Sequence, residues 1–152
     1  MTLRISLLVA AILALLPLQG AIAQTDADPA EIARHCVRVI NARTTWAVGS
    51  IGETTDATLH RIHRLHASGA SDREIIAAGH AGVHRVTRLA AIATESIQAV
   101  TRRCVAALTA AGAGRQLIAR VISASDDAQA HIAAAAERAR TTIHAAVRRA
   151  IG

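Results

Sequence analysis

The sequence has almost no aromatic residues: one Trp, no Phe and no Tyr among 152 residues. Lysine is absent as well, so all 17 basic residues are Arg. Sheets draw on aromatic and β-branched side chains, whereas this chain is rich in Ala, the best helix former. Charged residues make up only 18% and apolar residues 52% of the chain, which excludes an intrinsically disordered protein. The composition predicts one all-α domain.

The N-terminal segment has the three parts of a secretory signal peptide. Arg4 lies in a short basic start, an apolar run follows from residue 5 to residue 16, and small residues precede Gln24. We expect cleavage after Ala23, which leaves a mature domain of residues 24–152. The apolar run is shorter than the roughly 20 residues that a spanning helix needs, so we expect no transmembrane anchor after cleavage. An uncleaved anchor is the alternative. The expected location is the periplasm or the outside of the cell.

Signatures of catalysis are missing from the sequence. It contains no Gly-x-Ser-x-Gly sequence, no glycine-rich phosphate loop and no haem-attachment motif. The only Met is Met1, in the signal peptide, which excludes haem ligation by a Met–His pair in the exported domain. The one pair of adjacent acidic residues, Asp126 and Asp127, is explained by a solvated helix face. We therefore expect that the protein is not an enzyme.

Three breaks divide the exported part into long helical segments. Residues 28–31, Asp-Pro-Ala-Glu, combine an N-cap, a first-position Pro and a third-position Glu. Residues 71–74, Ser-Asp-Arg-Glu, form a capping box, and the glycines of residues 111–114 make the third break. Short connections force neighbouring helices to run antiparallel. The prediction is an antiparallel three-helix bundle with helices at about residues 29–67, 72–110 and 115–150.

Small and apolar residues recur at steps of three and four along each predicted helix. The middle segment has the longest such seam, which is typical of a coiled coil sustained over five heptads. Its members are Ile76, Gly79, Val83, Val86, Ala90, Ala93, Ile97, Val100, Cys104, Ala107 and Ala111. The first segment loses the rhythm between Gly49 and Gly52, which predicts a kinked or broken helix near Gly52. The alternative is a helix split there, giving a four-helix arrangement.

The two cysteines occupy matching positions in the first two predicted helices. If these helices fold back about residue 70, residues at the same level have numbers that sum to about 140. Cys36 and Cys104 meet this condition, and an exported protein reaches a compartment that permits oxidation. We therefore predict an intrachain disulfide, with the two Cα atoms within about 7 Å of each other.

The same register relates four candidate metal ligands near the first turn. His60 is level with His80, and Asp56 is level with His84. Imidazole and carboxylate groups on facing helices form transition-metal sites in helix bundles. The sequence thus predicts a candidate site for Zn²⁺ or another divalent transition metal, formed by Asp56, His60, His80 and His84. We expect His60 to approach His80 but the four-ligand geometry to be incomplete, because a kink near Gly52 would rotate part of the site away. Solvated side chains and no cofactor are the alternative.

Two arginine pairs are candidate anion contacts: Arg102, Arg103, Arg148 and Arg149. Nucleic-acid recognition would require aromatic stacking platforms, so we expect no specific nucleic-acid binding. The expected partners are envelope anions, such as lipid phosphates or acidic polysaccharide, or another protein, and a solvated basic face is the alternative. The leading hypothesis is an exported, non-enzymatic structural or interaction protein of the cell envelope. The alternative hypothesis is a periplasmic metal-binding or metal-sensing bundle that uses the histidines near the first hairpin.

Overall fold

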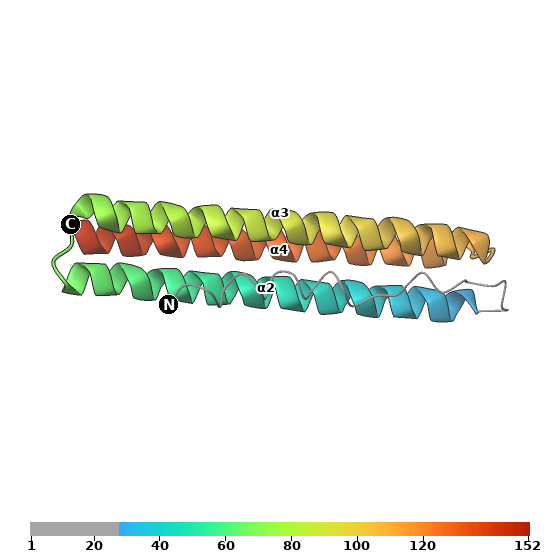
Figure 1. Cartoon of the computed structure of the whole chain (residues 1–152). Coiled ribbons are helices and arrows are strands. Elements are labelled where there is room, and N and C mark those ends of the chain that lie inside the picture. Colours follow the sequence, from blue (N-terminus) through green and yellow to red (C-terminus); the bar gives the residue numbers. More distant parts are fainter. Residues whose placement is uncertain (1–27) are drawn as a thin grey trace.

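A computed structural model describes residues 28–152, which form three long helices and no strand (Figure 1). The helices are α2 (Pro29–Ala67), α3 (Asp72–Ala110) and α4 (Arg115–Ile151). Each helix packs against the other two, with α2 and α4 parallel and α3 antiparallel to both. The predicted three-helix bundle is confirmed. The predicted signal peptide, residues 1–23, lies outside the described residues.

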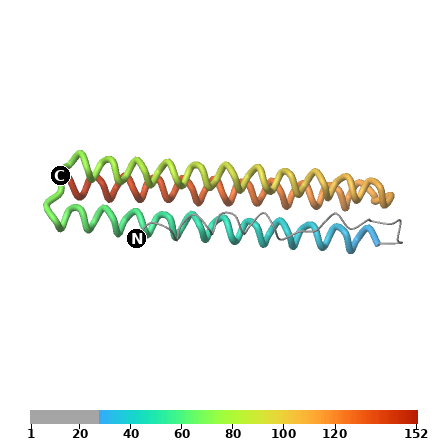
Figure 2. Tube along the Cα trace, viewed as in Figure 1, coloured from blue at the N-terminus to red at the C-terminus, as the bar shows by residue number. Residues whose placement is uncertain are grey.

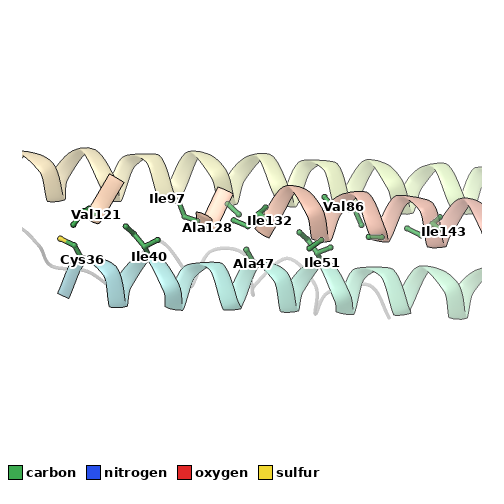
Figure 3. Packing of buried hydrophobic residues seen from close by; sticks show 14 of the residues in the cluster. Cys36, Ile40, Ala47, Ile51, Val86, Ile97, Val121, Ala128, Ile132 and Ile143 are labelled. Carbon is green, nitrogen blue, oxygen red and sulfur yellow. The ribbon is translucent and has the colours of Figure 1, made fainter. Parts of the chain in front are cut away.

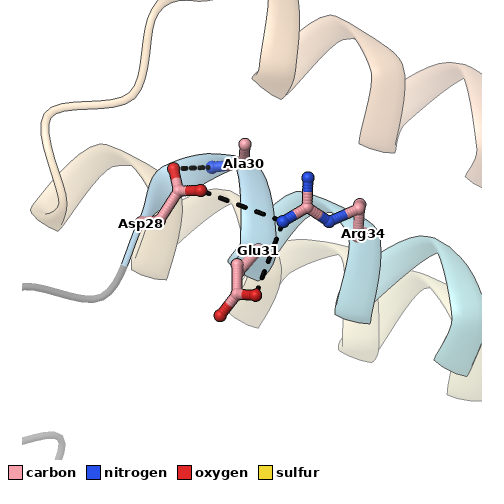
Figure 4. Close-up of polar contacts among 4 residues, drawn as sticks. All are labelled: Asp28, Ala30, Glu31 and Arg34. Atoms are coloured by element: carbon pink, nitrogen blue, oxygen red, sulfur yellow. Dashed lines mark hydrogen bonds and ion pairs between the residues drawn. The ribbon is translucent and has the colours of Figure 1, made fainter.

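The start of α2 is stabilised by the residues that predicted it (Figure 4). The Asp28 carboxylate accepts a hydrogen bond from the backbone N–H of Ala30 at 2.9 Å. The Arg34 guanidinium lies 3.8 Å from Asp28 and 3.5 Å from Glu31. Acidic groups in a first turn compensate unpaired N–H groups and the positive end of the helix dipole. Local interactions therefore determine where α2 begins.

The two turns are also determined by local chemistry. Gly69 and Gly112 have φ values of +72° and +68°, in the left-handed region that glycine adopts at helix C-termini. At the start of α3, the Glu74 carboxylate accepts hydrogen bonds from the Ser71 hydroxyl at 2.7 Å and the Ser71 N–H at 2.9 Å. The hydrogen bond from the Ser71 hydroxyl, and to a smaller extent the one from the Ser71 backbone N–H, holds the pKa of Glu74 below its usual value. This capping box determines where α3 begins.

The core is built from large aliphatic side chains that recur every eleven residues. Those exposed by no more than 2% are Ile40, Ile51 and Ile62 in α2; Ile75, Val86, Ile97 and Leu108 in α3; and Val121, Ile132 and Ile143 in α4. A spacing of eleven corresponds to about 3.67 residues per turn, which favours a right-handed supercoil over the left-handed one of heptads. Figure 2 shows the three helices running side by side with little curvature. Eleven-residue repeats, not the predicted heptads, describe this core.

This longer period corrects the ends of the seam predicted for α3. Near the start of the helix, Ile75 and Gly82 are buried, whereas the predicted Ile76 and Val83 are only half-buried. At the other end the core position is Leu108, one residue beyond the predicted one. A heptad seam advances by about 3.5 residues per turn and the core by about 3.67, so the two diverge away from the middle of the helix.

Large side chains of one helix lie level with small ones of its neighbours. In Figure 3, Ile132 of α4 lies at about the same level along the bundle as Ala47 of α2. The closest approaches are at glycines of α3: a Cβ on Gly82 would lie 2.3 Å from Thr58 Cγ2. A Cβ on Gly79 would lie 2.4 Å from a Val147 methyl. The small residues thus let α3 approach α2 and α4 closely at these points.

Helix α2 runs without interruption through Gly52, so the predicted break and the four-helix alternative are wrong. Figure 2 shows α2 as a regular coil without a sharp kink along its length. The core here contains two threonines: the Thr55 hydroxyl donates to the Ile51 carbonyl at 2.7 Å, and the Thr58 hydroxyl donates to the Thr54 carbonyl at 2.8 Å. Because these bonds satisfy both hydroxyls within the helix, the threonines occupy core positions that an apolar pattern does not reveal.

Replacing Gly52 by Ala is expected to raise the free energy of unfolding by about 0.5–1 kcal/mol. Gly52 is exposed, no heavy atom lies within 4 Å of an added Cβ, and glycine in a helix interior is destabilising relative to Ala by this amount. Chemical denaturation of the purified chain measures the change. Gly82→Ala is the matched control and should lower stability, because its Cβ collides with Thr58. A destabilised Gly52→Ala protein would contradict a continuous α2.

Candidate functional site

The predicted disulfide is present in the structure. Cys36 of α2 and Cys104 of α3 are bonded, with their Cα atoms 6.0 Å apart, inside the expected limit. Both residues are buried, at 3% and 9% exposure. The bond lies toward the end of the hairpin opposite the α2–α3 turn, so it closes nearly the whole hairpin into a covalent loop.

The four candidate metal ligands do not form a site. Asp56, His60, His80 and His84 are all exposed. Within residues 28–152, no three side chains of His, Cys, Asp or Glu are grouped closely enough to hold a metal ion. The metal-binding alternative thus gains no support from the structure.

The candidate ligands lie at matching levels along the bundle, but on helix faces that do not point toward each other. His60 lies two residues from Thr58 and two from Ile62, both buried and each about 200° around the helix from it. Its side chain therefore points away from the bundle, and His84 has the same relation to buried Gly82 and Val86. The Thr58–Gly82 contact keeps the register of the disulfide, so a rotation near Gly52 is not the cause.

Sequence reasoning missed an accumulation of basic residues at one end of the bundle. Parallel helices α2 and α4 both end there, beside the α2–α3 turn (Figure 1). The contacts of Gly79 with Val147 and of Thr58 with Gly82 put residues 57–67 level with residues 143–151, and these two segments contain four Arg and four His and no Asp or Glu. These are Arg61, Arg64, Arg148, Arg149, His60, His63, His66 and His144. We call this set the basic end. Its sequence signal is the lack of acidic residues in both segments, which becomes informative only when they are aligned in parallel.

The structure separates the two candidate arginine pairs. All four side chains are exposed, but only Arg148 and Arg149 belong to the basic end. Because Gly79 faces Val147, Arg149 is level with residue 77 of α3, and Arg102 lies about 38 Å further along the bundle. The four arginines therefore cannot contact one small anion together.

Within residues 28–152, no arginine of the basic end lies within 4.0 Å of an acidic side chain. Among residues 28–152, only Arg34 and Arg140 lie within 4.0 Å of an acidic side chain, the latter paired with Glu137. An open depression at the end of α2 is lined by Arg61, Arg64, Leu65 and Ser68. The Ser68 hydroxyl donates to the Leu65 carbonyl, and the lining has two guanidinium groups and no carboxylate. This lining favours an anion over a cation.

The helices can be compared with membrane-spanning helices, and the chain with known proteins. Within the described residues, no helix combines the length and the apolar character needed to cross a bilayer. Comparison with protein-family models, with curated protein sequences and with solved structures found no match of any of these three kinds.

Proposed function

We propose that this chain is an exported, non-enzymatic helical-bundle protein that acts as a structural or interaction module of the cell envelope. The observation that carries the proposal is the buried Cys36–Cys104 bond between two helices, across a sequence separation of 68. Disulfides persist in secreted and periplasmic proteins and are rare in the cytosol. The signal-peptide pattern of residues 1–23 supports the same compartment.

The arrangement of polar groups supports a non-enzymatic role. All eight histidines are exposed, and each buried side-chain N or O atom of residues 28–152 has a hydrogen-bond partner. Active sites require concave pockets in which reactive groups are brought together and shielded from water. The interior of this bundle is instead filled by aliphatic side chains and Ala. Recognition is therefore assigned to the outer surface.

The dimensions of the bundle suit a rigid spacer. Helices α2 and α3 each contain 39 residues, so each is about 58 Å long at a rise of about 1.5 Å per residue. The disulfide ties α2 to α3 at one end, and the short turn joins them at the other. Such a rod presents two separate ends to partners at a constant distance.

The test is the fate of the full chain in a bacterial host that has a periplasm. We expect osmotic shock to release a protein whose intact mass begins at Gln24 and whose two thiols are blocked by one disulfide. The matched control carries Ala21→Arg and Ala23→Arg, which remove the small residues that the signal peptidase requires and should prevent release. A cytosolic protein that retains Met1 and has two free thiols would refute the proposal.

A further inference from the structure

We infer that the basic end binds the anionic phospholipid headgroups of a membrane surface, with the rod standing end-on. This inference rests on the proposed envelope function and adds a partner and a surface to it. The parallel C-terminal parts of α2 and α4 place four Arg and four His side by side. The acidic residues of the neighbouring α3 start, Asp72 and Glu74, lie in its first turn, and Glu74 is already bound by Ser71.

Helix dipoles explain only part of this basic end. Basic side chains in the last turn stabilise the negative end of a helix, which accounts for Arg64, His66, Arg148 and Arg149. The effect fades beyond that turn. Arg61 precedes the last turn of α2, and His144 lies seven residues before the end of α4. The basic end thus extends beyond what helix stability uses, and the charge of Arg61 is available to a partner.

The end of the rod fits a lipid surface better than a soluble polyanion. Ile151, the last residue of α4, is a large apolar side chain at 37% exposure, and Arg148 and Arg149 precede it by one turn or less. A guanidinium group can donate two parallel hydrogen bonds to one phosphate. An apolar side chain at the tip is stabilised when it is buried in the layer beneath the headgroups. The only aromatic side chain, Trp46, lies about 30 Å from the end of α2, so nucleic-acid bases find no stacking platform there.

The test compares two variants with the same change of charge at opposite ends of the rod. Full-length R148Q/R149Q loses two arginines of the basic end, whereas R102Q/R103Q loses two from α3 about 38 Å away. Both retain residues 1–27, so any contribution of that segment to vesicle binding is the same. Flotation with vesicles of phosphatidylglycerol and phosphatidylcholine in equal parts should show about 30-fold weaker binding for R148Q/R149Q. R102Q/R103Q should bind the vesicles like the unmodified protein, and added salt should weaken the vesicle binding of these two proteins.

Four results would overturn the inference. These are equal losses in the two variants, equal binding to pure phosphatidylcholine vesicles, tighter binding to soluble dextran sulfate than to the anionic vesicles, and a blue shift of Trp46 emission on binding. The third would assign the basic end to a polysaccharide, and the fourth would show that the rod lies on its side. None of them affects the export test, because that test reads the mass and the thiols of the exported chain. Unchanged Trp46 emission together with selective loss in R148Q/R149Q is the expected result.

Discussion

Removal of the disulfide in Cys36→Ala/Cys104→Ala is expected to lower the free energy of unfolding by about 4 kcal/mol. The bond closes a loop with a sequence separation of 68, and a cross-link over such a length removes much conformational entropy from the unfolded chain. Small domains are stable by only about 5–15 kcal/mol, so this loss is a large share of the total. Chemical denaturation of the oxidised protein and of the double variant measures the difference.

A reducing agent separates the cross-link from the change of side chain. Reduction should destabilise the unmodified protein almost as much as the double substitution does, and it should leave the double variant unchanged. A reduced protein as stable as the oxidised one would mean that the bond adds nothing, and covalent dimers on a non-reducing gel would contradict the intrachain pairing.

Replacing Ile75 by Ala is expected to lower the free energy of unfolding by about 2–5 kcal/mol, the usual cost of truncating a buried Ile. Ile75 is 1% exposed and occupies one of the eleven-residue core positions of α3. Its neighbour Ile76 is only half-buried, so Ile76→Ala removes the same atoms and should cost less than half as much. Thermal or chemical unfolding of the two variants provides the comparison.

This adjacent pair discriminates between the two core periods. A heptad seam places Ile76 in the core, whereas the eleven-residue repeat places Ile75 there together with Val86, Ile97 and Leu108. If Ile76→Ala proved the more damaging change, α3 would have to be rotated about its own axis by the angle that separates adjacent residues. The buried positions assigned near the α2–α3 turn would then be wrong.

The helix ends could be predicted because their causes are local. Asp28 caps the N–H of Ala30, two residues away, and Ser71 and Glu74 are three residues apart. Gly69 and Gly112 end their helices through their own backbone conformation. Interactions over so few residues are visible in a single stretch of sequence, and the observed bounds agree with the expected ones to within one residue.

The level of each residue along the first hairpin could also be predicted. It depends only on a constant rise per residue and on the position of the turn, both of which follow from the sequence. For this reason Cys36 and Cys104 could be predicted to lie level with each other, and the expected oxidising compartment made a bond between them the natural prediction. The contact of Thr58 with Gly82 keeps the same register some twenty residues further along each helix.

The face that each residue presents depended on the packing of all three helices. A difference between about 3.5 and 3.67 residues per turn is too small to read from a pattern of Ala and Val, yet it accumulates along a helix of this length. It decides that Ile75 rather than Ile76 is buried. The rotation of each helix about its axis also makes His60 and His84 point outward. Residues at the same level near the turn therefore do not form a metal site.

Contacts between the first and last helices were the other feature beyond the reach of sequence. The composition, the three helices and the disulfide follow from residues that are neighbours in the chain or in one hairpin. The basic end instead joins residues 57–67 to residues 143–151, which become neighbours only when α4 packs in parallel with α2. Sequence alone shows a run of histidines and arginines in one segment and an arginine pair in another. Their union into one basic surface is a consequence of the bundle, because packing on a shared core brings two helix C-termini to the same end.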